Sequence, residues 1–213
     1  MALSQIKSSI AIMGGMDYTY RFLKNPNFDN KLGTYNYSTG LNFERQISKN
    51  YWLQIGLRYS SLGHQIIIKG LKWGTEHDGM GGYKYDPTLN HSFQTITNYT
   101  FLEIPIGIKY IFNKNSIWIP YILAALSTNI YLSTITREIT DFTDKTETER
   151  SPQIHRISLS TNLGFGIDYS IGKNFSLFAQ SLFCYHFTKL VAGPNGEYLY
   201  SYGIELGVKK GFN

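Results

Sequence analysis

The sequence predicts an all-β protein: an eight-stranded antiparallel up-and-down barrel that spans a membrane. Apolar and polar residues alternate along eight segments, which is the period of a half-buried strand. Tight turns alternate with long connections, as in a meander whose tight turns all lie at one end. Aromatic residues make up 15% of the chain and charged residues only 16%, well below the roughly 25% of a soluble domain.

The first half of the chain contributes four clearly alternating segments. They are residues 10–22, 35–44, 51–60 and 102–110. Each places Ile, Leu, Tyr or Phe on one face and Gly, Ser, Asn or a charged residue on the other. In the first segment, Asp17, Thr19 and Arg21 oppose a face of large apolar side chains. We therefore expect strands with one apolar and one polar face.

The second half contributes four segments with less uniform patterns. They are residues 117–134, 156–169, 175–187 and 198–209. The first is apolar on both faces, so its phase stays open. The third alternates weakly, and we place Gln180 and His186 on its polar face. The other two alternate as clearly as the segments of the first half.

Connections of two kinds join these segments. The tight turns are residues 48–50, 113–116 and 172–174. The long connections, which we expect to be loops, are residues 23–33, 70–92, 135–154 and 189–197. Pro105 and Pro120 each remove a backbone donor inside a predicted strand, so we expect a β-bulge near each. Nothing resembles a linker, and we expect a single domain over residues 1–213.

The composition excludes several other classes of protein. No apolar run approaches the roughly 18 residues of a membrane helix. A single cysteine, Cys184, excludes a disulfide scaffold. The net charge is +5, but the basic residues are scattered, so we expect no nucleic-acid partner. Residues 1–15 lack the apolar core of a signal peptide, so an exported chain would be the mature form.

The position of glycine indicates that the polar face lies inside the barrel. Glycines recur on that face, at Gly40, Gly56, Gly107, Gly164, Gly166, Gly203 and Gly207. An eight-stranded barrel has room only for side chains in its interior, so missing side chains are useful there. A soluble lipocalin-like barrel, with its apolar face inside, is the alternative.

Aromatic residues at both ends of the strands also favour the membrane. Toward the long loops lie Tyr18, Tyr20, Tyr35, Tyr37, Tyr59, Tyr198, Tyr200 and Tyr202. Toward the tight turns lie Tyr51, Trp52, Tyr110, Phe112, Trp118, Tyr169 and Phe175. Two such girdles mark the two lipid interfaces of a transmembrane barrel. We therefore expect membrane lipid around the barrel.

Several stretches resemble a known family of outer-membrane barrels. Residues 102–110, LEIPIGIKY, are similar to the signature strand of the Bacteroidota outer-membrane β-barrel family that includes the PorT-like proteins. The Pro-Tyr pair at 120–121, residues 14–18 and residues 175–180 are similar to other parts of that family. The sequence departs from it at Gln180, where Glu is usual, and at Asn213, which follows the terminal Phe212.

The resemblance implies an outer-membrane location and an eight-stranded fold. It implies no activity or cofactor. Some members of the family are linked to protein secretion machinery, so it also implies other outer-membrane or periplasmic proteins as partners.

Charged residues on the polar faces predict an ion network in the barrel interior. They are Asp17, Arg21, Glu44, Arg58, Glu103, Lys109, Arg156, Asp168, Glu205 and Lys209. Charges in so narrow a barrel must pair, because an unpaired buried charge is very costly. We expect the network to plug the lumen; a proton or small-ion path is the alternative.

Serine and histidine offer a weak catalytic possibility. Ser60 and His64 share a face, and His186 would lie near Ser201 and Glu205 on the next strand. No nucleophile motif surrounds them, so we expect no enzyme. A lipid-modifying enzyme remains an alternative.

Possible metal ligands are no more informative. The acidic residues of 141–149 lack the spacing of a calcium loop, and His77, Asp78 and His91 form no clear ligand set. We expect no metal and no cofactor.

The connection at 70–92 is the best candidate for recognition. Trp73, Tyr83 and Tyr85 alternate there with glycine and charge, as in many binding loops. A loop folded over the barrel mouth is the alternative. We expect a structural or accessory subunit of a larger envelope or secretion-type assembly. The second hypothesis is a stand-alone barrel that binds an extracellular ligand through its long loops.

Overall fold

The computed structural model describes residues 7–23, 31–69, 88, 92–113, 116–172, 174–190 and 197–212. These residues form nine β-strands. The strands are β1 (Ser8–Leu23), β2 (Lys31–Gln46), β3 (Tyr51–Lys69), β4 (Ser92–Ile111), β5 (Trp118–Thr140), β6 (Asp144–Glu149), β7 (Ile157–Ser170), β8 (Phe175–His186) and β9 (Glu197–Phe212). Among the described residues, no helix is long and apolar enough to cross a bilayer.

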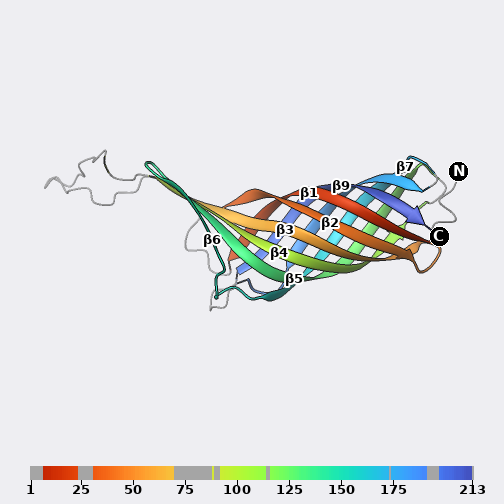
Figure 1. The fold of residues 1–213 in the computed structure, drawn as a ribbon, viewed down its shortest axis with the longest axis horizontal. Helices are drawn as coiled ribbons and strands as arrows, with labels where there is room; N and C mark the ends of the chain where they lie inside the picture. Colours follow the sequence, from red (N-terminus) through yellow and green to blue (C-terminus); the bar gives the residue numbers. More distant parts are fainter. Residues whose placement is uncertain are drawn as a thin grey trace.

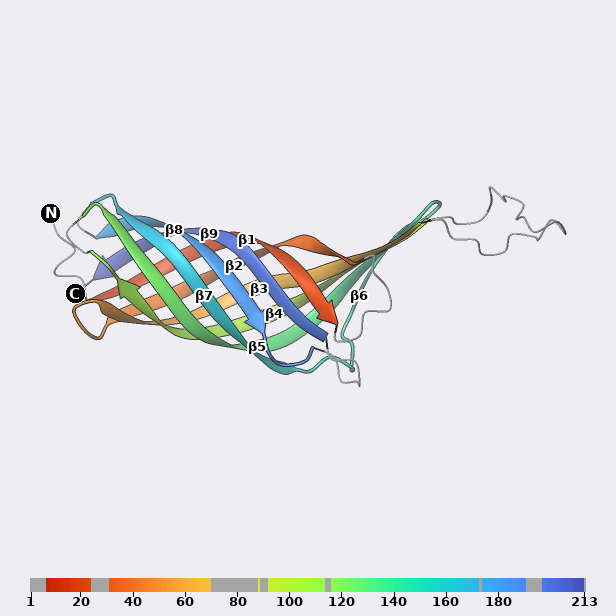
Figure 2. The same cartoon turned by 180° about the vertical axis from the view of Figure 1, so that it is seen from behind.

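Eight of the strands close into an antiparallel barrel (Figures 1 and 2). Their order is β4-β3-β2-β1-β9-β8-β7-β5, and pairing of β4 with β5 closes the ring. Strand β1 pairs with β9, so the two ends of the chain meet in the wall. The predicted eight-stranded barrel is therefore confirmed.

Strand β6 lies outside the ring and pairs with the end of β5. The prediction of a loop over residues 135–154 was wrong, because β5 runs on to Thr140 and β6 returns beside it. Ile135 and Ile139 continue the alternation of β5 beyond the barrel, whereas the side chains of β6 are all exposed and form no apolar face that sequence alone would reveal.

Together, the ends of β3 and β4 and the β5–β6 hairpin form what we call the protruding sheet: residues 65–69, 92–98, 134–140 and 144–149. It extends from the barrel as a narrow ribbon, opposite the end that holds both termini (Figure 1). The two β-ladders at its centre are unbroken, from β3 to β4 and from β4 to β5.

The two prolines do not cause bulges, so that prediction was wrong. At Pro105, the β3–β4 ladder lacks two residue pairs but resumes in the same register. At Pro120, the register with β7 is continuous, and the opposing strand β4 ends at Ile111. The register shifts instead between Gly33 and Ser38, and between Thr100 and Phe101.

The polar faces of the strands point into the barrel and the apolar faces point outward. Ile12, Leu126 and Ile204 on three different strands are each more than 60% exposed. Strand β5, whose phase was open, buries Tyr121 and Asn129 and exposes Leu126 on its outer face. An apolar outer wall around a polar interior is the arrangement of a transmembrane barrel.

Apolar clusters close both ends of the polar interior. At the tight-turn end, Trp52, Ile111, Ile119 and Tyr121 pack together. Trp52 is buried there, so its predicted place in the outer aromatic girdle was wrong. At the long-loop end, the cluster consists of Leu62, Tyr99, Phe101, Tyr131, Ile154, Leu190 and Leu199.

Interior glycines make room for large side chains on the neighbouring strand. A Cβ at Gly166 would collide with the ring of Tyr121, and one at Gly207 with the ring of Phe178. Both rings therefore lie flat across a glycine inside the barrel. This is the physical reason for glycine on the concave face.

Candidate functional site

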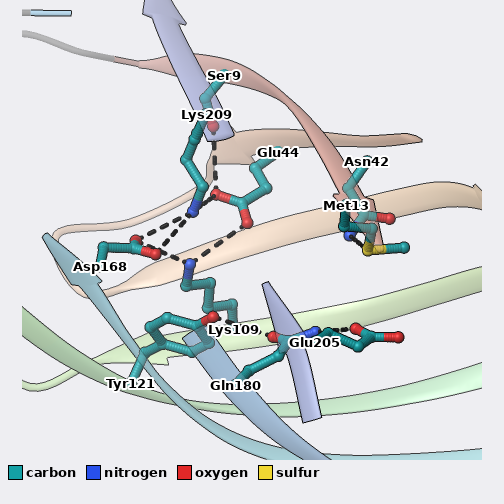
Figure 3. Close-up of polar contacts among 10 residues, drawn as sticks. All are labelled: Ser9, Met13, Asn42, Glu44, Lys109, Tyr121, Asp168, Gln180, Glu205 and Lys209. Atoms are coloured by element: carbon teal, nitrogen blue, oxygen red, sulfur yellow. Dashed lines mark hydrogen bonds and ion pairs between the residues drawn. The ribbon is translucent and has the colours of Figure 1, made fainter. Parts of the chain in front are cut away.

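The interior near the tight turns holds a compact group of four charges, the turn-side cluster: Glu44, Lys109, Asp168 and Lys209 (Figure 3). Lys109 Nζ lies 3.3 Å from Glu44 and 3.0 Å from Asp168. Lys209 Nζ lies 2.9 Å from Glu44 and 3.0 Å from Asp168. Each lysine bridges both carboxylates, so the two positive and two negative charges balance.

The second group lies farther along the lumen. We call it the mid-barrel cluster: Asp17, Arg58, Glu103 and Glu205. Arg58 lies 2.6 Å from Glu205 and 3.7 Å from Glu103. Asp17 is close enough to interact electrostatically with all three other members. Three buried carboxylates therefore share one guanidinium within the cluster.

Two neutral side chains connect the clusters. Tyr121 donates a hydrogen bond to Gln180 at 3.0 Å, and Gln180 donates one to Glu205 at 2.5 Å (Figure 3). Lys109 lies over the Tyr121 ring at 3.5 Å, in cation–π contact. A Glu at position 180, usual in the family that the sequence resembles, would place another carboxylate against Glu205. Glutamine supplies a donor instead.

These side chains fill the lumen. All eight members of the two clusters are less than 9% exposed. A cavity of about 40 Å³ remains near Trp52 and Lys209, which is room for one or two water molecules. Buried charged and polar side chains therefore occupy the described part of the lumen.

The remaining predicted interior charges lie elsewhere. Arg156 is exposed and precedes β7, so its predicted place in the network was wrong. The alternation of the sixth segment did not reveal that its strand begins only at Ile157. Arg21 is half-buried on β1, on the long-loop side of Asp17.

The candidate catalytic residues are buried and engaged in other contacts. Ser60 donates a 2.5 Å hydrogen bond to Glu103. His64 stacks on Tyr99, with ring centroids 5.9 Å apart. His186 contacts the Asn129 amide at 3.4 Å, and its strand pairing places it opposite Ser160.

The other predicted sites are only partly visible. Trp73, Tyr83 and Tyr85 lie outside the described residues, as do His77, Asp78 and His91. Within the described ranges, no group of three or more His, Cys, Asp or Glu side chains could hold a metal ion. Cys184 is buried on β8.

The protruding sheet is the one described feature of the long-loop end that sequence reasoning missed. Every residue of β6 is exposed. Arg137 Nε donates to Asp144 at 2.9 Å, and this hydrogen bond lowers the pKa of the Asp144 carboxyl. Lys145 lies 2.5 Å from Glu147. The signal was present as alternating Ile and Thr over 134–140, continuing the period of the barrel strand.

A closed antiparallel barrel with a polar, filled interior and an apolar outer wall defines a membrane-spanning β-barrel. Residues 4–192 match the sequence model of the family described as "Outer membrane protein beta-barrel domain". The chain belongs to this family and is a protein of the bacterial outer membrane. No curated protein matches its sequence.

Solved structures with a similar fold include several outer-membrane barrels. Neisserial surface protein A (NspA) is 14% identical, with 95% of this chain and 97% of that chain covered and a TM-score of 0.51. OprG from Pseudomonas aeruginosa is 14% identical, with 100% of both chains covered and a TM-score of 0.47. The outer membrane protease OmpT from Escherichia coli is 9% identical, with 100% and 98% covered and a TM-score of 0.45. At these identities, the likeness to NspA supports the barrel fold alone.

Proposed function

We propose that this protein is a non-enzymatic outer-membrane barrel that acts as an accessory subunit and binds a partner protein through its protruding sheet. The observation that carries the proposal is the contrast between a filled lumen and a sheet beyond the barrel, in which the ends of β3, β4 and β5 continue and β6 is added. If the lumen is filled, a partner has to bind to the surface outside it. The protruding sheet is the part of that surface that extends beyond the barrel (Figure 2).

The contacts of the candidate catalytic residues support a role other than catalysis. A hydrolase needs a nucleophile within hydrogen-bond reach of a base. Ser60 donates its hydroxyl hydrogen bond to Glu103, and His186 contacts the amide of Asn129. Both side chains are nearly fully buried, where a lipid or peptide substrate has no access.

The class of assembly follows from the resemblance to the PorT-like proteins of Bacteroidota. Residues 102–110 and the Pro-Tyr pair at 120–121 carry that resemblance. It supports a secretion-type envelope assembly as the setting for the partner.

Purification from native outer membranes tests the accessory role. Tagged protein is extracted in mild detergent, and co-purifying proteins are identified by mass spectrometry. We expect a partner in a fixed ratio. A matched variant replaces residues 138–145 by Asn-Gly, so that the pair Arg137–Thr146 is followed by a two-residue turn. This variant should keep the barrel and lose the partner. A clean monomer from the unaltered chain would contradict the proposal.

Conductance tests the filled lumen. The purified protein in a planar bilayer is expected to show no stable conductance steps, because charged and polar side chains occupy the interior. Regular steps would indicate an ion path and would contradict a plugged barrel.

A stand-alone binder of an extracellular ligand is the second candidate. It is favoured by Trp73, Tyr83 and Tyr85 in the connection between β3 and β4. Replacing residues 70–91 by a short turn separates the two: a ligand binder loses its ligand, whereas an accessory subunit held through the protruding sheet keeps its partner.

A further inference from the structure

We propose that the partner binds by adding an extended, basic segment as a further strand along the open edge of β6. This inference rests on the proposed function and specifies the chemistry of the partner. Strand β6 pairs with residues 134–139 of β5. In the described part of the chain, no strand pairs with its other edge. An open edge presents unpaired backbone N–H and C=O groups, which an extended segment can satisfy.

The position of β6 makes its edge accessible. It lies along one side of the protruding sheet, away from the barrel wall (Figure 1). All six of its side chains are exposed. Its backbone is held by six consecutive residue pairs with β5, from Asp144 to Glu149. An added strand would therefore meet a fixed template, so that only the added strand has to be ordered on binding.

The charge of this hairpin selects a basic partner. Residues 137–149 carry five carboxylates against two cations, whereas the whole chain has a net charge of +5. The five carboxylates are Glu138, Asp141, Asp144, Glu147 and Glu149. Arg137 and Lys145 already have partners in Asp144 and Glu147, which leaves acidic groups in excess. A strand carrying Lys or Arg would place cations opposite these groups.

A second copy of this chain is disfavoured as the occupant by the net charge of β6. The strand carries three carboxylates and one lysine, so pairing of two copies would bring together two strands of the same net negative charge. The edge therefore suits a basic strand better than a second β6.

The experiment measures binding of synthetic peptides to the full chain in detergent micelles at low salt. The probe is a six-residue peptide that alternates Lys and Thr. Its first control is the same peptide with alternate backbone nitrogens methylated, which keeps the charge but removes donors on one edge. Its second control replaces Lys by Glu. We expect at least tenfold weaker binding of both controls.

Variants of the protein locate the site. Glu147→Lys with Glu149→Lys should weaken binding of the Lys-Thr peptide at least tenfold, and replacing 138–145 by Asn-Gly, which shortens the β6 edge to residues 146–149, should also weaken it. Lys49→Gln, exposed in the tight turn at the opposite end of the barrel, serves as the distant control and should leave binding unchanged. Equal binding of the methylated peptide would overturn strand addition, and self-association through β6 without peptide would overturn the assigned occupant.

These outcomes are separable from the proposed function. If a native partner is found but remains on the chain with Glu147→Lys and Glu149→Lys, the accessory role stands and the edge proposal fails. If the peptide binds as expected but native membranes yield no partner, the accessory role fails while the basic-strand site stands.

Discussion

The two charge clusters in the lumen differ in balance, although the same barrel holds them. In the turn-side cluster, two lysines each contact both carboxylates. In the mid-barrel cluster, one guanidinium serves three carboxylates. The members of a balanced group of buried charges are strongly coupled, because removing one member leaves the others without a full set of partners. An unbalanced group has a member whose removal relieves repulsion. We therefore expect the turn-side cluster to stabilise the barrel strongly. We expect the mid-barrel cluster to lower its stability through repulsion between the carboxylates.

Breaking the balanced cluster should have the largest effect. Lys109→Met leaves two carboxylates with one lysine and removes the cation above Tyr121. The free energy of unfolding should fall by about 3–5 kcal/mol, as for removal of one partner of a buried ion pair. Urea unfolding of the barrel in lipid vesicles measures this. Adding Asp168→Asn restores the charge balance and should recover part of the loss; no recovery would argue against charge balance as the cause.

Disturbing the two side chains that connect the clusters should have the next largest effect on stability. Gly166→Ala places a methyl group against the Tyr121 ring and the Gln180 side chain, which together connect them. Overpacking of this kind should cost about 1–3 kcal/mol in the same unfolding assay. Gly14→Ala, whose methyl group would meet only a backbone oxygen at 3.8 Å, is the matched control. Equal effects would show that the concave face is not crowded.

Relieving the unbalanced cluster should change stability in the opposite direction. Asp17→Asn keeps the shape of the side chain and removes one of three carboxylate charges. We expect a gain of about 1 kcal/mol in the free energy of unfolding, since neutralising Asp17 removes its repulsion with Glu205 and Glu103. The paired substitution Asp168→Asn in the turn-side cluster should be destabilising. If both variants lose stability, the distinction between the clusters is wrong.

The protruding sheet should contribute least to stability. Arg137→Ala removes the ion pair with Asp144, in which both side chains are about half exposed. Exposed ion pairs contribute little, so no measurable change in barrel unfolding is expected. Thermal unfolding of the variant beside the unaltered chain checks this. A clear loss would mean that the sheet and the barrel unfold as one unit.

The barrel fold, and which face of each strand points into the lumen, could be predicted from the amino-acid sequence alone. Alternation along β1, β2 and β9, with glycine and charge on one face, required strands with a polar interior, and the structure has this arrangement. The period of two is a local property, so sequence reveals it directly. The same reasoning failed at Trp52 and Arg156, which lie where strands begin and the end of a pattern is ambiguous.

Which charged side chains form ion pairs depends on the closure of the barrel. Glu44, Lys109, Asp168 and Lys209 come from β2, β4, β7 and β9, and closure of the ring brings them across the lumen. The stagger of the strands sets which residues share a level, and no local pattern encodes it. Strand β6 was equally hidden, because all six of its side chains are exposed and an exposed strand needs no apolar face. The sequence of each strand therefore specifies which side chains it buries, and closure of the barrel specifies which side chains they contact across the lumen.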